Sequence, residues 1–219
     1  MVLAKVHSAA HVGFDGTLIE VECDITNGLP SIIIVGLGSK AIDEAKERIR
    51  SSIKNSDLAM PRKRITLNLA PADLPKDGAS YDLPMAIAIL TASQQINPNL
   101  LNESLFIGEL SLNGELRPVR GIISHIEVAK RHKIKRVFVP KDNALQASLV
   151  SDIEIVEVTS LKHVVKLLMD PRLIKPFVMS NQRHTRQDSE IDFSDIYGQQ
   201  QAKRALEIAV AGSHNILMT

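Results

Sequence analysis

Residues 65–90 read ITLNLAPADLPKDGASYDLPMAIAIL, and this stretch decides the fold class. Residues 64–69 carry β-branched side chains and predict a strand. A polar loop at 72–79 follows, and residues 83–96 are apolar on almost every side, which indicates a helix buried in the centre of a domain. A strand joined by a loop to a buried helix is the unit from which α/β folds are built.

The alternation of strands and helices continues on both sides of this stretch. Ala4–Val12 and residues 18–25 predict a hairpin, residues 32–35 predict a buried strand, and the spacing of Ile42, Ala45, Ile49 and Ile53 predicts a helix. Asn113-Gly114 is a hairpin turn signal. Further strands are expected at 105–110, 136–139, 153–158 and 215–218, and further helices at 121–132, 144–150, Leu161–Met169 and Gln200–Ala211. We therefore expect an α/β (α+β) domain with a mixed sheet.

Composition excludes several classes of protein. The chain has 219 residues, of which 44% are apolar and 23% charged, so disorder is excluded, and with 3% aromatics the core must be aliphatic. A net charge of +1 argues against a polyelectrolyte function. The single cysteine, Cys23, permits no internal disulfide, and the histidines lack metal-ligand spacing, so no metal site is expected. No apolar run reaches the roughly 18–20 residues of a membrane span, and there is no signal peptide, so we expect a cytoplasmic protein without membrane contacts.

The polar loop before the buried helix is the first place where chemistry is expected. Lys76, Asp77 and Ser80 are the candidates, and Ser80 becomes a nucleophile only if a base lies beside it. A simpler alternative is that Asp77, Ser80 or Asp82 caps the helix, because hydroxyl and carboxylate caps are far commoner than nucleophiles. The spacing alone favours the cap.

Four segments together carry a family resemblance. Residues 34–50 contain VGLGSKAIDEAKERIR, residues 65–90 are quoted above, residues 108–121 read GELSLNGELRPVRG, and residues 191–218 complete the set. Their order resembles the proteolytic domain of Lon-type proteases, and more closely the N-terminal part of Mg-chelatase-like AAA+ ATPases of the ComM/YifB family. The resemblance implies a fold like the Lon protease C-terminal domain and ribosomal S5 domain 2. The glycine turn at 36–39 departs modestly from the family's usual G-L-P-D.

The resemblance also divides the chain. It implies a Lon-like, non-proteolytic domain at 1–170, a linker at 171–190 and the start of an AAA+ domain at 191–219, truncated before the phosphate loop. Ile196, Tyr197 and Gly198 match the family's adenine-side loop. The G-x-x-x-x-G-K-[ST] loop that wraps phosphates does not occur in the sequence. ATP and Mg²⁺ are therefore expected for the full-length family, and no cofactor for this chain.

The Lon resemblance places Ser80 at the position of the family's nucleophile. The position that matches the catalytic lysine is Ile123, whose side chain can neither accept nor donate a proton. Lys76 is the other side chain that could act as the base. A Lon-like serine peptidase that uses Ser80 therefore stays as an alternative, and no catalytic residue is assigned.

Basic residues provide the remaining candidates for binding. The clusters selected for nucleic-acid contact are Arg62, Lys63, Arg64, Arg117 and Arg120. A solvated surface is the simpler alternative, given the balanced net charge and the few aromatics available for stacking.

The resemblance implies that the full-length protein is a hexameric homo-oligomeric ring that processes DNA by branch migration in natural transformation. For this chain we expect a DNA-contact or subunit-assembly module without ATP hydrolysis. A third possibility is an inactive product of a truncated or split gene.

Overall fold

The computed structural model describes residues 3–12, 15–36, 40–74, 76, 79–179 and 192–218. The chain forms two compact units, Met1–Met179 and Ser180–Thr219. The predicted turn at Phe14, the glycine turn at 37–39, Asp77 and most of the predicted linker lie outside the described residues.

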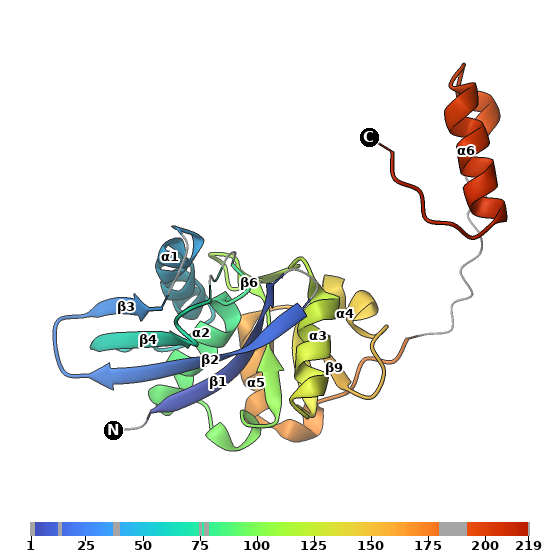
Figure 1. The fold of residues 1–219 in the computed structure, drawn as a ribbon. Coiled ribbons are helices and arrows are strands. Elements are labelled where there is room, and N and C mark those ends of the chain that lie inside the picture. Colours follow the sequence, from blue (N-terminus) through green and yellow to red (C-terminus); the bar gives the residue numbers. More distant parts are fainter. Residues whose placement is uncertain are drawn as a thin grey trace. The chain divides into compact units, whose positions relative to one another are not determined.

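The first unit is built on a seven-stranded mixed sheet with the order β3-β4-β2-β1-β5-β8-β9 (Figure 1). The β1–β2 and β2–β4 pairs are antiparallel and the other four pairs are parallel. The strands are β1 (Ala4–Val12), β2 (Asp15–Thr26), β3 (Ser31–Val35), β4 (Arg64–Ala70), β5 (Ser104–Phe106), β8 (Arg136–Pro140) and β9 (Glu154–Val158). The mixed α/β fold class and the β1–β2 hairpin are confirmed.

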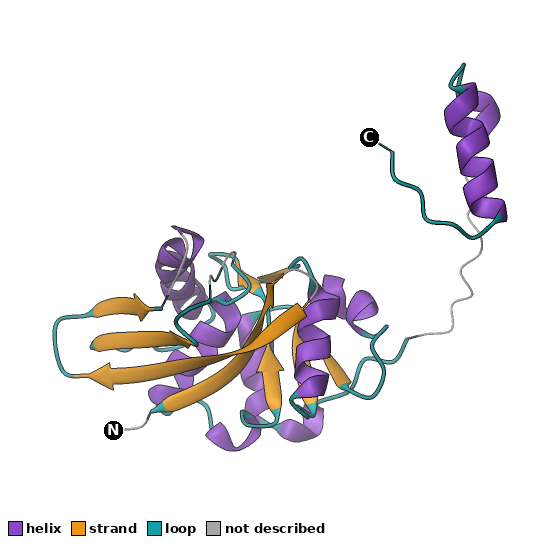
Figure 2. Cartoon of the chain, in the orientation of Figure 1, coloured by secondary structure: helices purple, strands orange, loops and turns teal. Residues whose placement is uncertain are grey.

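Helices cover both faces of this sheet (Figure 2). One core joins α1, α2 and α5 to alternate strand residues such as Val6 and Phe138, and the other joins α3 and α4 to the intervening residues such as Ala9 and Val137. This division follows from the period of two in a strand, which sends successive side chains to opposite faces. The helices are α1 (Lys40–Asn55), α2 (Asp82–Ala92), α3 (Ile122–Arg131), α4 (Lys141–Ala147) and α5 (Leu161–Met169), with 3₁₀ turns η1 (Pro98–Leu100) and η2 (Pro171–Leu173).

Helix α2 is the central element of the first core, as its all-round apolar sequence predicts. Ten of its residues, from Asp82 to Thr91, are buried. The helix ends at Ala92 and not at 96, because Gln94 takes a left-handed conformation with φ of 62°. The core is aliphatic apart from a few rings, of which Phe106 and Phe138 stack with centroids 4.7 Å apart.

Two other predicted boundaries are corrected. The segment 105–110 forms two strands, β5 and β6 (Glu109–Leu110), because the backbone at Gly108 leaves the sheet to pair with the loop before α2. β6 and β7 (Leu116–Arg117) form an antiparallel hairpin whose turn holds Gly114 at φ of +87°, as the Asn-Gly signal predicts. Helix α4 begins at Lys141, directly after Pro140, and so three residues earlier than predicted.

The second unit contains η3 (Phe193–Asp195) and α6 (Gln200–Ala211). A capping box between Asp192 and Asp195 fixes the start of η3. The strand expected at 215–218 is wrong: these residues have no regular structure, since a strand needs a neighbour for its backbone groups and the described part of this unit offers none. None of the helices described in either unit is long and apolar enough to cross a membrane.

Candidate nucleic-acid interface

The loop before α2 holds the residues that the sequence singles out for catalysis. The side chain of Lys76 is fully buried, and its ammonium donates to the carbonyl oxygens of Leu74, at 2.9 Å, and Pro71. Burial lowers the pKa of Lys76 from its ordinary value. The lysine therefore holds its own loop together, and its ammonium is engaged by main-chain oxygens.

Ser80 lies half-buried at the end of the same loop, just before α2. Its carbonyl oxygen accepts a hydrogen bond from the Gly108 amide at 3.1 Å, and the Leu83 amide donates to the Gly108 carbonyl at 3.1 Å. These two bonds tie the loop to the chain that follows β5. The backbone thus fixes Ser80 firmly, while its hydroxyl has no described base as a partner.

The prediction that Ser80 or Asp82 caps the helix is wrong, and the third candidate, Asp77, lies outside the described residues. The residue at the N-cap is Tyr81, and it makes no side-chain cap hydrogen bond. The buried Asp82 carboxylate instead accepts from Arg48 Nε at 2.6 Å, Arg48 Nη2 at 3.1 Å and the Leu110 amide at 3.2 Å. Asp82 therefore links α1, α2 and β6. Its partner Arg48 is 34 residues away in the chain, so no local sequence pattern indicates this role.

Burial raises the pKa of the Asp82 carboxyl to about 6, although the Arg48 guanidinium and the Leu110 amide oppose this shift. Arg48 is itself mostly buried, with 19% of its side chain exposed. Asp82 is thus a structural carboxylate that becomes charged close to neutral pH.

Ile123 occupies the position that matches the Lon lysine. It lies on α3, and 39% of its surface is exposed. Neighbouring His125 is buried, and its Nδ1 lies 2.8 Å from the Gly121 carbonyl oxygen. Helix α3 therefore offers an aliphatic side chain where a peptidase of this type requires a proton carrier.

The segment Pro61–Arg64 carries the first basic cluster. Arg62, Lys63 and Arg64 are all exposed, and none of them forms a salt bridge with a described residue. Pro61 and Lys63 contribute to the lining of two grooves. Exposed cations without acidic partners keep their full charge available for an anionic ligand.

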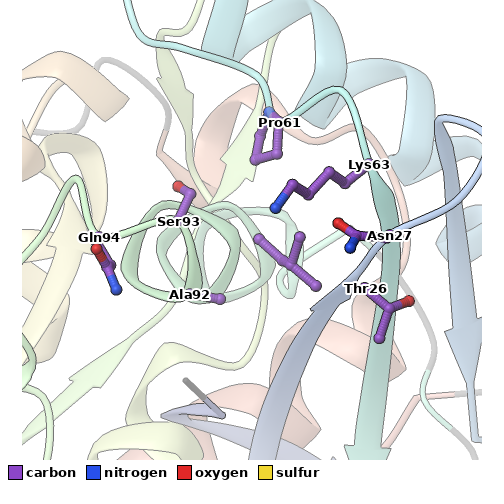
Figure 3. Close-up of a pocket in the computed structure, with 8 residues that line it drawn as sticks. Thr26, Asn27, Pro61, Lys63, Ala92, Ser93 and Gln94 are labelled. Carbon is purple, nitrogen blue, oxygen red and sulfur yellow. The ribbon is translucent and has the colours of Figure 1, made fainter. Parts of the chain in front are cut away.

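The first groove, here called the polar groove, has a volume of about 600 Å³ (Figure 3). The Lys63 side chain extends into it between Pro61 and Asn27. Ser93 and Gln94, at the end of α2, add further hydrogen-bonding groups. The complete lining is Ile25, Thr26, Asn27, Pro61, Lys63, Ala92, Ser93 and Gln94, none of them acidic.

The second groove, here called the apolar groove, has a volume of about 370 Å³. Arg50 and Lys54, on the last turns of α1, join Arg62 and Lys63 at its rim, and this convergence was not predicted from the sequence. The basic end of α1 was a usable signal, but only the packing of α1 shows which loop it meets. The lining is Pro30, Ser31, Ile32, Arg50, Lys54, Leu58, Met60, Pro61, Arg62, Lys63 and Ile65.

Arg117 and Arg120 line neither groove. Arg117 lies on β7, and its Nη1 is 3.4 Å from Glu109 Oε1. Arg120 is exposed just before α3. The structure therefore separates the five basic residues selected from the sequence into a cluster of three and two that lie elsewhere.

A further basic cluster at the end of α3 differs in its surroundings. Lys130, Lys133 and Lys135 line a shallow depression together with Asp152 and Glu154. Lys130 pairs with Asp152 at 3.2 Å, and Lys135 lies 3.9 Å from Glu103. Nearby carboxylates neutralise this cluster, which makes it a natural control for the segment Pro61–Arg64.

The residues expected beside adenine lie in the second unit. Ile196 and Gly198 stand between η3 and α6, and Tyr197 is 95% exposed. Lys203 donates to the Ile196 carbonyl oxygen, and Gly198 takes φ of +74°, which favours glycine. The role of these residues stays a prediction.

Two family models match the chain. Residues 21–143 match the model described as subunit ChlI of Mg-chelatase, and residues 192–219 match the model described as magnesium chelatase, subunit ChlI. The first match covers most of the sheet and helices α1–α3.

Similar proteins extend over nearly the whole chain. The competence protein ComM of Haemophilus influenzae is 43% identical over 99% of this chain and 43% of its own length. The uncharacterized protein YifB of Escherichia coli K12 is 41% identical over 100% of this chain and 42% of its own length. The chain thus spans less than half the length of these two relatives. Lon protease 2 of Bacillus subtilis is 29% identical over 74% of this chain and 31% of its own length.

Proposed function

The chain belongs to the ComM/YifB group of Mg-chelatase-like proteins, and we propose that its first unit is a DNA-contacting module without peptidase activity. We assign the module to an ATP-driven DNA-processing protein of the kind that the family resemblance implies. In this proposal ATP, Mg²⁺ and a homo-oligomeric ring belong to the full-length protein. The 219 residues contain no G-x-x-x-x-G-K-[ST] loop to hold phosphates, and they act by binding.

The observation that carries the proposal is the cationic segment at 62–64. Its three exposed side chains have no described acidic partner, and neither adjacent groove has an acidic residue in its lining. In the polar groove, Lys63 lies beside the neutral side chain of Asn27, and Ser93 lines the same groove (Figure 3). A cation beside such groups suits a phosphate oxygen, the group that dominates affinity for DNA.

DNA binding by the 219-residue chain tests this proposal. Fluorescence anisotropy with a labelled 30-base duplex would compare the wild type with a triple variant carrying Arg62→Ala, Lys63→Ala and Arg64→Ala. We expect the affinity to fall about tenfold or more at low salt. The slope of log K against log salt should decrease by about 3, since each phosphate contact contributes roughly 0.9.

The matched control removes Lys130, Lys133 and Lys135 by the same change to alanine. This variant loses equal charge from a cluster that carboxylates neutralise, and its affinity should stay within about twofold of the wild type. Equal losses in both triple variants would show that only net charge matters, and an unchanged affinity in the first would refute the proposed site.

The peptidase alternative has a direct test at Ser80. With Ile123 in the lysine position and the Lys76 ammonium engaged by Leu74 and Pro71, Ser80 lacks an activating base among the described residues. We expect a fluorophosphonate probe to leave Ser80 unlabelled, with a Lon-type protease as the positive control. Labelling that disappears in Ser80→Ala would instead establish the peptidase.

A further inference from the structure

The two edge strands of the sheet, β9 and β3, differ in whether other residues cover them. At the β9 edge, the Phe177 amide donates to the Ile155 carbonyl oxygen at 2.6 Å, and the Phe177 side chain packs against the second core. At the opposite edge, β3 pairs only with β4, and Figure 1 shows it as the outermost strand. One edge is thus covered by the chain itself, while the other is not covered by any described residue.

The register of the β3–β4 pair shows which backbone groups of β3 point away from the sheet. Ser31 pairs with Arg64, and its amide donates to the Lys63 carbonyl at 3.4 Å, so residues 31, 33 and 35 direct their backbone groups to β4. The amides and carbonyls of Ile32 and Ile34 therefore turn away from the sheet. No hydrogen bond joins these groups to a described residue. They form a short ladder that a further strand can complete.

The sequence of β3 lacks the usual protection of an edge. It reads Ser-Ile-Ile-Ile-Val, with no charge and no proline within the strand. Natural edge strands are commonly blunted by lysine, proline or a bulge, because an unprotected apolar edge pairs with other chains. An edge left unprotected in a folded protein suits the addition of a strand from a partner.

The apolar groove beside β3 specifies the chemistry of that partner. Ile32, Leu58 and Met60 give the groove an apolar lining, which accepts an aliphatic side chain. Arg50, Lys54 and Arg62 line the same groove with no carboxylate in its lining. Glu47, on the same helix, pairs with Arg50 at 2.9 Å, whereas Lys54 and Arg62 form no salt bridge with a described residue, so the groove favours an acidic ligand. The lining contains no aromatic residue on which a nucleic-acid base could stack, so a peptide fits this groove better than single-stranded DNA.

We propose that the β3 edge and the apolar groove bind an extended segment of a partner protein. The segment adds a strand to β3 through the outward groups of Ile32 and Ile34. It places an aliphatic side chain in the groove and acidic side chains beside Arg50 and Lys54. This inference goes beyond the proposed DNA contact and does not depend on it, because it uses the strand edge and α1 and not the polar groove.

Fluorescence anisotropy of the 219-residue chain with a labelled nine-residue peptide, Val-Thr-Glu-Thr-Val-Thr-Glu-Thr-Val, tests the proposal. Its valines and glutamates are an even number of residues apart, so in a strand they face the same side and can enter the groove together. Two further peptides serve as probes: one with lysine in place of glutamate, and one with alternate backbone amides methylated. We expect binding of the first peptide and at least tenfold weaker binding of the other two. N-methylation removes the donors that strand addition needs, so this comparison requires no change in the protein.

Two variants test the protein side. Ile34→Pro removes an outward amide without breaking a β4 hydrogen bond and should weaken binding at least tenfold, while Ile34→Val should stay within about twofold. Arg50→Glu with Lys54→Glu should also weaken binding at least tenfold. The matched control, Lys133→Glu with Lys135→Glu, changes a distant cluster and should have no such effect. Circular dichroism verifies that each variant is folded.

Four outcomes would overturn the inference. The first is that no peptide binds at millimolar concentration, and the second is that the N-methylated peptide binds as tightly as the unmethylated one. The third is that the Arg50/Lys54 variant loses affinity for DNA but keeps its affinity for the peptide. The fourth is a dimer in light scattering that Ile34→Pro abolishes, which would assign the edge to a second copy. Arg64→Ala separates this inference from the DNA proposal, because Arg64 belongs to the cationic segment but lines neither groove. DNA affinity should fall in this variant while peptide binding stays unchanged.

Discussion

The ion pair of Arg48 and Asp82 and the cationic segment at 62–64 use similar side chains in opposite surroundings. Asp82 is fully buried, and all of its described partners come from other elements. The segment at 62–64 is exposed and has no described acidic partner. A charge that is satisfied inside the fold stabilises structure, and a charge left available at the surface can bind a ligand. The loop that looks catalytic in the sequence belongs to the first kind.

The largest expected effect is on stability, at Asp82. Asp82→Ala removes the hydrogen-bonded carboxylate partner of the mostly buried Arg48, whose contact with Glu44 is longer at 4.0 Å, and removes the acceptor of the Leu110 amide. The free energy of unfolding should therefore fall by about 3–5 kcal/mol. Urea unfolding followed by circular dichroism measures this loss. A decrease of less than about 1 kcal/mol in the free energy of unfolding would show that the buried ion pair contributes no more to stability than an exposed charge.

The second prediction concerns pH and the same carboxyl group. Its pKa is about 6 in the folded protein and 3.8 as the ordinary value, so the folded state holds a proton that the unfolded state releases between these pH values. Deprotonation of Asp82 should therefore lower the free energy of unfolding by about 3 kcal/mol in total as the pH rises from about 4 to 6. The comparison is with Asp82→Asn, which cannot titrate, at pH 4 and pH 8. Parallel pH profiles for the two proteins would contradict the raised pKa.

The third prediction addresses one cation of the exposed segment. Lys63→Ala should leave the free energy of unfolding within about 0.5 kcal/mol of the wild type, since the side chain is exposed and has no described salt-bridge partner. The salt slope of DNA binding should decrease by about 1. Thermal unfolding and anisotropy at several salt concentrations give both quantities. A clear loss of stability with an unchanged slope would make Lys63 structural.

The smallest effect is expected at the two arginines that the structure separates from the grooves. Replacement of Arg117 and Arg120 by alanine should change DNA affinity by less than about twofold, because neither lines a groove and Arg117 faces Glu109. The same anisotropy assay measures it. A loss as large as that of the triple variant at 62–64 would extend the DNA contact to the β6–β7 side.

Much of the fold was predictable because its signals are local. The all-round apolar sequence of α2, the alternation in β1 and β2 and the Asn-Gly turn between β6 and β7 each identified the element that the structure contains. The errors lie where longer-range contacts decide. Gly108 splits a predicted strand because its backbone pairs with Ser80, and residues 215–218 have no described strand beside them.

The candidate site was predicted only in part. The sequence shows Arg62-Lys63-Arg64 as three adjacent cations, which is consistent both with a DNA contact and with a solvated surface. The grooves beside these residues, which are known only from the structure, favour the DNA contact. Arg50 and Lys54 join it only because α1 packs across the first core and ends beside this loop. The pairing of Asp82 with Arg48 spans 34 residues and leaves no pattern in the sequence.

The sequence by itself determined the α/β class, the aliphatic core, the family and the aliphatic residue at the Lon lysine position. These follow from side-chain size, period and order along the chain, which are properties of neighbouring residues. The tertiary structure decided which charges are satisfied, which sheet edge is left open and which basic residues share a groove. Such properties depend on residues far apart in the chain, because burial and hydrogen bonding are settled only when the elements pack together.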